Sequence, residues 1–77
     1  MYRYEVVRMD RSSRKLFGIL GREKLDGDWI PVVVAAPFSS NCEAVSMLAE
    51  KCTTCQLSPE HLIDVISDFI SQTASGT

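Results

Sequence analysis

The spacing of apolar residues changes near residue 40, and this change is the strongest constraint on the fold. Before it, short runs of branched and aromatic residues are separated by turn signals, which is typical of β-strands. After it, apolar residues recur every three or four positions, which is typical of helices packed by one face. A sheet-forming half followed by a helix-forming half predicts an α+β domain.

The first half of the chain predicts three strands, at residues 2–9, 15–23 and 29–36. Residues 10–14 form a polar turn, and the Asp26-Gly27 pair is a hairpin signal. Gly18 and Gly21 within the second strand indicate a bulge or a close backbone approach. Because short connections favour pairing of consecutive strands, we expect a three-stranded antiparallel meander.

The third predicted strand is apolar on both faces. Pro31 has no backbone N–H, which places this strand at an edge of the sheet. Strict alternation puts Ile30, Val32 and Val34 on one face and Trp29, Val33 and Ala35 on the other. Helices on one side of the sheet can cover only one of these faces. We therefore expect this edge strand to be an interface, either by strand-to-strand pairing or by packing of sheets, with Trp29, Val33 and Ala35 as its candidate residues.

The second half predicts two amphipathic helices packed on one face of the sheet. Ser40 and Glu43 match a capping box, in which each side chain bonds a backbone N–H at the helix start. Ser58 and Pro59 match the N-cap and the first position of the second helix. The predicted apolar stripes are Cys42, Val45, Leu48, Ala49 and Cys52 on the first helix and Leu62, Val65, Ile66, Phe69 and Ile70 on the second.

A length of 77 residues allows one domain. We place it at residues 1–72 and expect the polar residues 73–77 to fray. Burial in a domain this short leaves a stability margin of only about 3–5 kcal/mol. Such domains often gain stability from a metal, a disulfide or a second copy of themselves, so each becomes a hypothesis.

Charge is divided unevenly along a chain whose net charge is -2. Residues 1–24 carry seven Lys and Arg against three Asp and Glu, whereas residues 41–77 carry one Lys against five Asp and Glu. One alternative function is therefore a regulator that binds nucleic acid through Arg3, Arg8, Arg11, Arg14 and Lys15, with Tyr2, Tyr4 and Phe17 to stack bases. The acidic balance of the whole chain argues against it, because nucleic-acid-binding domains are usually strongly basic.

A second alternative is a small zinc protein, in which Cys52, Cys55 and His61 would be the ligands. Cys42 cannot join them, because about three helical turns, roughly 15 Å, separate it from Cys52. The simpler interpretation is that Cys42 and Cys52 are buried small hydrophobes, that Cys55 is a loop thiol, and that no cofactor binds. A thioredoxin-type redox pair is not expected, since such pairs lie at the start of a helix and this one lies at an end.

Glu60, Asp64 and Asp68 are spaced by four residues and predict an acidic ridge along the second helix. A solvated helix face is the simplest explanation. The functional hypothesis is a contact surface for a basic protein partner. His61 is expected at the corner between the helices, reaching back towards Ser58 or packing there.

The first residues enter a strand pattern directly, without the apolar segment of a signal peptide, and no apolar run approaches membrane-spanning length. Three cysteines are an odd number, which disfavours a disulfide framework. We therefore expect a cytoplasmic protein with reduced thiols and no membrane association.

Three segments carry a resemblance to a known family: Tyr2-Arg3-Tyr4, Phe17-Gly18-Ile19 and, most specifically, Leu57-Ser58-Pro59-Glu60-His61-Leu62. Over nearly its whole length the chain resembles a family of short cytoplasmic proteins of unknown function from anaerobic Gram-positive bacteria. Pro37-Phe38-Ser39 departs from the Asp-Ile-Ser-like segment of that family. The resemblance implies the fold and the compartment but no activity.

An enzyme is not expected, because the sequence has no glycine-rich phosphate loop, no nucleophile elbow and no carboxylate–histidine set on separate elements. The biochemical function stays unknown from the sequence. The favoured hypothesis is a small protein-interaction module that forms a homodimer.

Overall fold

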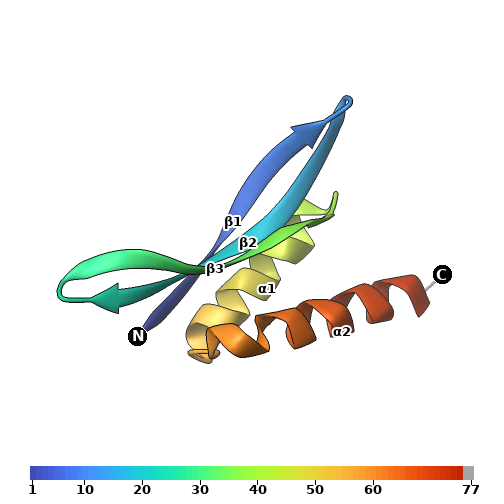
Figure 1. The fold of residues 1–77 in the computed structure, drawn as a ribbon. Helices are drawn as coiled ribbons and strands as arrows, with labels where there is room; N and C mark the ends of the chain where they lie inside the picture. The colour runs from blue at the N-terminus through green and yellow to red at the C-terminus, as the bar shows by residue number, and fades with distance from the viewer. Residues whose placement is uncertain (76–77) are drawn as a thin grey trace.

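The computed structural model describes residues 1–75 and confirms the predicted α+β fold. Strands β1 (Tyr2–Arg11), β2 (Arg14–Leu25) and β3 (Asp28–Ser39) form one antiparallel sheet in the order β1-β2-β3. Helix α1 (Cys42–Thr54), the 3-10 turn η1 (Pro59–His61) and helix α2 (Leu62–Ser75) follow. Figure 1 shows both helices on one side of a strongly twisted sheet, with both hairpin tips projecting beyond them.

Each hairpin turns through two residues in the left-handed backbone region. Ser12 and Ser13 have φ of 47° and 72°, and Asp26 and Gly27 have φ of 52° and 85°. Two positive φ angles make a turn whose twist matches that of the flanking strands. The first turn is therefore shorter than the predicted residues 10–14, and all three strands are longer than predicted because pairing continues up to the turns.

A β-bulge in β3 changes which side chains face the helices. Gly21 pairs with Val33 but Arg22 pairs with Pro31, so Val32 is an extra residue in β3. Pro31 is tolerated at this bulge because its missing N–H is not needed there. The bulge reverses the alternation of side chains along the strand, so the predicted grouping of Trp29 with Val33 and Ala35 is wrong.

The core lies between the sheet and the two helices. Its buried members are Tyr4, Phe17, Ile19, Ala35, Val45, Ala49, Cys52, Leu62 and Ile66. Gly21 makes room for the Tyr4 ring, because an added Cβ would lie 2.8 Å from Tyr4 Cε1 and 2.6 Å from Val33 Cγ1. The predicted stripe of α1 is buried at Val45, Ala49 and Cys52, but Cys42 is exposed. Cys42 is the first residue of the helix.

Helix α1 begins one residue later than predicted. Asn41 is the N-cap, and its side-chain Oδ1 accepts a hydrogen bond of 3.1 Å from the Ala44 N–H. The predicted capping box of Ser40 and Glu43 is therefore wrong. Asn is as good a cap as Ser, and only the backbone geometry decides between adjacent candidates.

Helix α1 ends in a Schellman motif. Gln56 has φ of 51°, its N–H bonds the Thr53 carbonyl at 3.1 Å, and the Leu57 N–H bonds the Cys52 carbonyl at 3.0 Å. These bonds satisfy carbonyls at the helix end and reverse the chain direction.

Helix α2 begins at Leu62 rather than at Pro59. The Ser58 side chain makes no capping hydrogen bond, and the Ser58 carbonyl accepts from the His61 N–H at 2.9 Å, which winds residues 59–61 as a 3-10 turn. Ser58 and Pro59 thus occupy the predicted N-cap and first position, but of the 3-10 turn that leads into α2, and the predicted capping bond of the Ser58 side chain is wrong.

The apolar stripe of α2 is only partly covered. Leu62 and Ile66 are buried, Val65 packs against the core, and the Phe69 ring meets Phe38 edge to face at 5.6 Å. Ile70, predicted as part of the stripe, is exposed. The helix continues to Ser75, past the predicted domain end at residue 72, and residues 76–77 of the predicted tail lie outside the described residues. Within the described chain, neither helix is long and apolar enough to cross a membrane.

Candidate functional site

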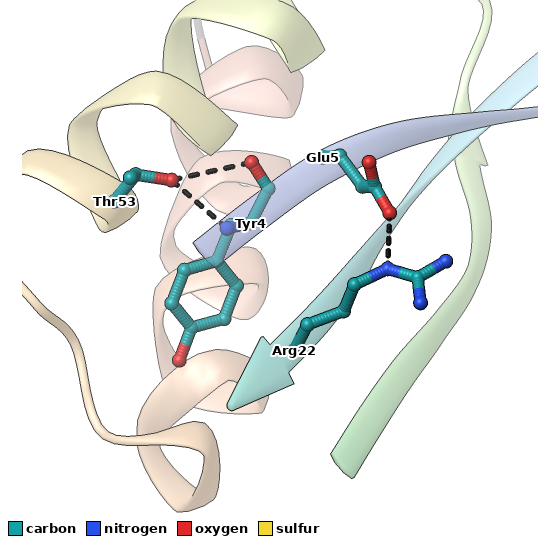
Figure 2. Close-up of polar contacts among 4 residues, drawn as sticks. All are labelled: Tyr4, Glu5, Arg22 and Thr53. Atoms are coloured by element: carbon teal, nitrogen blue, oxygen red, sulfur yellow. Dashed lines mark hydrogen bonds and ion pairs between the residues drawn. The ribbon is translucent and has the colours of Figure 1, made fainter. Parts of the chain in front are cut away.

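The outer edge of β1 is closed by two side chains from the end of α1. The Thr53 hydroxyl accepts from the Tyr4 N–H at 2.9 Å and lies 3.2 Å from the Tyr4 carbonyl, to which it can donate (Figure 2). The Gln56 amide accepts from the Tyr2 N–H at 2.8 Å and donates to the Tyr2 carbonyl at 2.9 Å. We call Thr53 and Gln56 the edge clamp, because they make the bonds that another strand would make.

The edge clamp was not predicted. One signal for it existed, since Thr53 lies four residues after Ala49 and so continues the buried stripe of α1 with a polar group. A polar residue at such a position is expected to have a buried partner. Which group is the partner of Thr53 could not be predicted, because Tyr4 lies 49 residues away along the chain.

Among the hydrogen bonds of the described residues, none reaches the outer edge of β3 at Val34. The two-residue turn makes Leu25 and Asp28 a hydrogen-bonded pair, and alternation from there gives Gly21–Val33 and Ile19–Ala35 as hydrogen-bonded pairs across the bulge. The N–H and C=O of Val34 therefore point away from β2. From Trp29 to Ser39 the strand carries no charged side chain, and charged side chains are the usual protection of an exposed edge.

The sheet face opposite the helices carries apolar side chains among charged ones. Val34 lies on it beside Leu20 and is 66% exposed, and the half-buried Val7 and Trp29 share this face by register. We call this set the outer face. It also carries the ion pair between Arg22 Nε and Glu5 Oε1, 2.5 Å apart (Figure 2).

The predicted interface residues are divided by the bulge. Trp29 is on the outer face, but Val33 packs against the core and Ala35 is buried in it. Val33 and Ala35 therefore cannot contact a partner, and this part of the prediction is corrected. Val34, which strict alternation predicted on the face opposite to Trp29, lies with Trp29 on the outer face instead.

A groove of about 270 Å³ lies between α1 and α2. It is lined by Leu48, Lys51, Cys52, Cys55, Leu57, Val65, Asp68, Phe69 and Gln72. Most of these residues are apolar, and both Cys52 and Cys55 are among them. His61 is not part of the lining.

The three candidate zinc ligands are not brought together. Cys52 is buried, Cys55 is exposed at the end of α1, and the exposed His61 side chain lies in η1 with its Nε2 3.8 Å from Glu60 Oε1. Among the side chains that the structure describes, no group of three His, Cys, Asp or Glu is placed to hold a metal ion. His61 neither reaches the Ser58 side chain nor packs in the helix corner; only its backbone bonds Ser58.

The predicted acidic ridge is split between two elements. Asp64 and Asp68 are exposed on α2, but Glu60 lies in the 3-10 turn before it. The spacing of four no longer aligns Glu60 with the others, because a 3-10 turn advances by a different angle per residue than an α-helix does. Asp68 faces the groove.

The aromatic side chains proposed to stack on bases belong to the core. Tyr4 and Phe17 are buried, and Tyr2 packs against the same cluster. At the tip of the β1–β2 hairpin, Arg8 already pairs with Asp10 at 3.2 Å. The hairpin thus retains exposed basic residues but lacks exposed aromatic rings beside them.

Comparison with known proteins gives a family and nothing closer. The sequence model of a family of unknown function, DUF6514, matches residues 1–72. A search of curated proteins and a search of solved structures each found no match. The matched region contains all three strands, α1, η1 and most of α2.

Proposed function

This chain belongs to the DUF6514 family, whose function is unknown, and we propose that it is a protein-interaction module that pairs with a second copy of itself along β3. The observation that carries the proposal is the contrast between the two sheet edges. The edge clamp occupies β1, whereas the backbone groups of Val34 in β3 point away from β2, within residues 29–39, which have no charged side chain. Such an edge is expected to pair with another strand.

The two prolines of β3 limit where that pairing can occur. Pro31 and Pro37 have no N–H and bracket residues 32–36. A two-fold axis at Val34 would pair this residue with Val34 of the second copy, each donating its N–H to the other's carbonyl. The Val34 and Leu20 side chains of the two outer faces would then lie close together on either side of the axis.

The test is sedimentation equilibrium of the wild type and of Val34→Lys up to high micromolar concentration. We expect a dimeric wild type and a monomeric variant, because a lysine pair at the symmetry axis repels. Met47→Lys is the matched control, since Met47 is 65% exposed and lies on α1, away from the sheet edge. A wild type that remains monomeric, or a Val34→Lys protein that dimerises as Met47→Lys does, would overturn the proposal.

Amide hydrogen exchange adds a measurement at single-residue level. In the dimer the Val34 N–H should exchange slowly despite lying at an edge, and it should exchange quickly in wild-type monomers obtained by dilution. Equal exchange at both concentrations contradicts edge pairing.

The proposed role is binding rather than catalysis, and the proposed compartment is the cytoplasm. The first rests on the sheet edge and outer face being the surfaces that the fold leaves unsatisfied. The second is supported by Cys42, Cys52 and Cys55, which are all free thiols.

A further inference from the structure

Two cysteines lie three residues apart at the end of α1, in a place that the proposed dimer does not use. Cys52 is in the last turn of the helix, and Cys55 is its C-cap, with φ of -83° and ψ of -3°. Residues three apart on a helix have Cβ atoms about 5–6 Å from each other. Both thiols also line the groove between α1 and α2.

The expected separation of the two Cβ atoms is slightly larger than a disulfide requires. A disulfide needs Cβ atoms about 3.5–4.5 Å apart, so the last turn must tighten slightly to form one. This turn is at a helix end, where it is held by the Leu57 N–H on the Cys52 carbonyl and the Cys55 N–H on the Lys51 carbonyl, at 3.0 and 2.9 Å. A helix end adjusts at lower cost than a helix interior does, because fewer hydrogen bonds must move.

The two thiols differ in access. Cys55 is exposed, whereas Cys52 is only 4% exposed and lies beneath it in the core. Burial raises the pKa of the Cys52 thiol, and the neighbouring Cys55 charge raises it further, while Lys51 opposes the shift. A reagent in solution therefore meets Cys55 first, and Cys52 is held beside it as the second thiol.

We propose that Cys52 and Cys55 form a redox-active dithiol that low-molecular-weight disulfides, such as oxidised glutathione, convert into an intramolecular disulfide. The Cys55 thiolate attacks one sulfur of the reagent, and the other sulfur leaves as a thiolate. Cys52 loses its proton to water and attacks the Cys55 sulfur, which releases the second reagent thiolate. The two cysteines are oxidised by two electrons in total, and the reagent disulfide is reduced to two thiols.

The structure also suggests what such a disulfide would affect. The Cys52 carbonyl holds Leu57, and the Leu57 carbonyl accepts the hydrogen bond of the Tyr4 hydroxyl. Tightening the turn would shift Leu57 and so change the hydrogen bond between Leu57 and Tyr4 of β1. Because the disulfide would be strained, it should also be easily reduced, as regulatory disulfides are.

The test treats the full chain with oxidised glutathione and follows its intact mass and its alkylated peptides. We expect Cys52 to become linked to Cys55 with the loss of two hydrogen atoms, whereas the exposed Cys42, which has no second thiol beside it, can carry only a glutathione adduct. Cys52→Ala should stop as a glutathione adduct on Cys55, and Cys42→Ala should behave as the wild type does. Cys42 is the matched control because it is exposed at the opposite end of the same helix.

A wild type that stops as a glutathione adduct on Cys55, or that reacts only at Cys42, would overturn the proposal. Circular dichroism checks the fold of Cys52→Ala, since this substitution is in the core. Cys55→Ala leaves the core intact and must abolish the loss of two hydrogens, so the proposal stays testable even if Cys52→Ala unfolds. Neither result depends on whether the chain dimerises.

Discussion

The hydroxyl of Thr53 bridges both backbone groups of Tyr4, so that α1 takes the place of a strand beside β1. The same hydroxyl lies 3.0 Å from the Ala49 carbonyl in its own helix. One hydroxyl thus serves a strand and a helix that the chain separates by 49 residues. This relationship explains why β1, an edge strand, is protected while β3 is open.

Thr53→Val should destabilise the protein. Valine has the shape of threonine but cannot accept from the Tyr4 N–H, and an unsatisfied, partly buried donor costs about 1–3 kcal/mol. We expect the free energy of unfolding, measured by urea denaturation, to fall by about 1–2 kcal/mol. The control is Thr54→Val, at the exposed neighbouring position, which should stay within about 0.5 kcal/mol of the wild type. Equal losses in the two variants would contradict the role of the edge clamp.

Stability should fall at high pH because of Tyr4. Burial raises the pKa of Tyr4 to about 12 from its ordinary value of 10.0, and the charges of Cys52 and Tyr2 add to the shift. The folded state favours the neutral phenol, so its contribution is complete below about pH 10 and is lost as the pH rises through about 12. Urea denaturation at about pH 9 and about pH 12 should differ by about 2 kcal/mol from this group.

Two phenylalanine variants isolate that effect from other groups that titrate at high pH. Tyr4→Phe should be less stable at neutral pH, because it loses the hydrogen bond to the Leu57 carbonyl. It should also lose part of the decline at high pH. Tyr2→Phe should keep most of the decline, because burial is the largest cause of the Tyr4 shift and the Tyr2 charge only adds to it. A Tyr4→Phe protein with an unchanged pH dependence would show that this phenol is not responsible.

Ser13→Gly should stabilise the first hairpin. Ser13 has φ of 72°, a conformation that glycine adopts without the steric cost of a side chain. We expect the relief of strain to raise the free energy of unfolding by about 0.5–1 kcal/mol at most, because the greater freedom of glycine in the unfolded chain offsets part of it. Thermal unfolding measures the gain, and Ser13→Ala, which keeps a Cβ, should show none. A Ser13→Gly protein less stable than Ser13→Ala contradicts the turn geometry.

Gly18→Ala should cost more stability than Gly21→Ala. An added Cβ at Gly18 would lie 2.5 Å from the Ala35 carbonyl oxygen, which is backbone and cannot move without bending β3. At Gly21 the nearest atoms belong to the side chains of Val33 and Tyr4, which can shift. Overpacking typically costs about 1–3 kcal/mol, so we expect the upper part of that range at Gly18 and the lower part at Gly21. Chemical denaturation of both variants gives the order, and the reverse order would contradict the close approach of β3.

Local patterns in the sequence were enough to determine the elements and their order. The Asp26-Gly27 pair, the polar residues before Arg14, and the change of apolar spacing near residue 40 each act within a few residues, and the structure confirms the meander and the two helices. Pro31 correctly indicated an edge strand, because a missing N–H has the same consequence in any fold. The position of Cys52 and Cys55 at a helix end also followed from spacing alone.

Tertiary structure alone decided which surfaces are available. Val32 can be recognised as an extra residue only when β3 is compared with β2. Strict alternation within β3 therefore predicted the wrong face for Val33 and Ala35. The choice of Asn41 over Ser40 as the cap, and the partners of Thr53 and Gln56, depend on where the helix meets the sheet. A sequence pattern reports which groups need a partner, whereas the identity of the partner is set by packing between segments far apart in the chain.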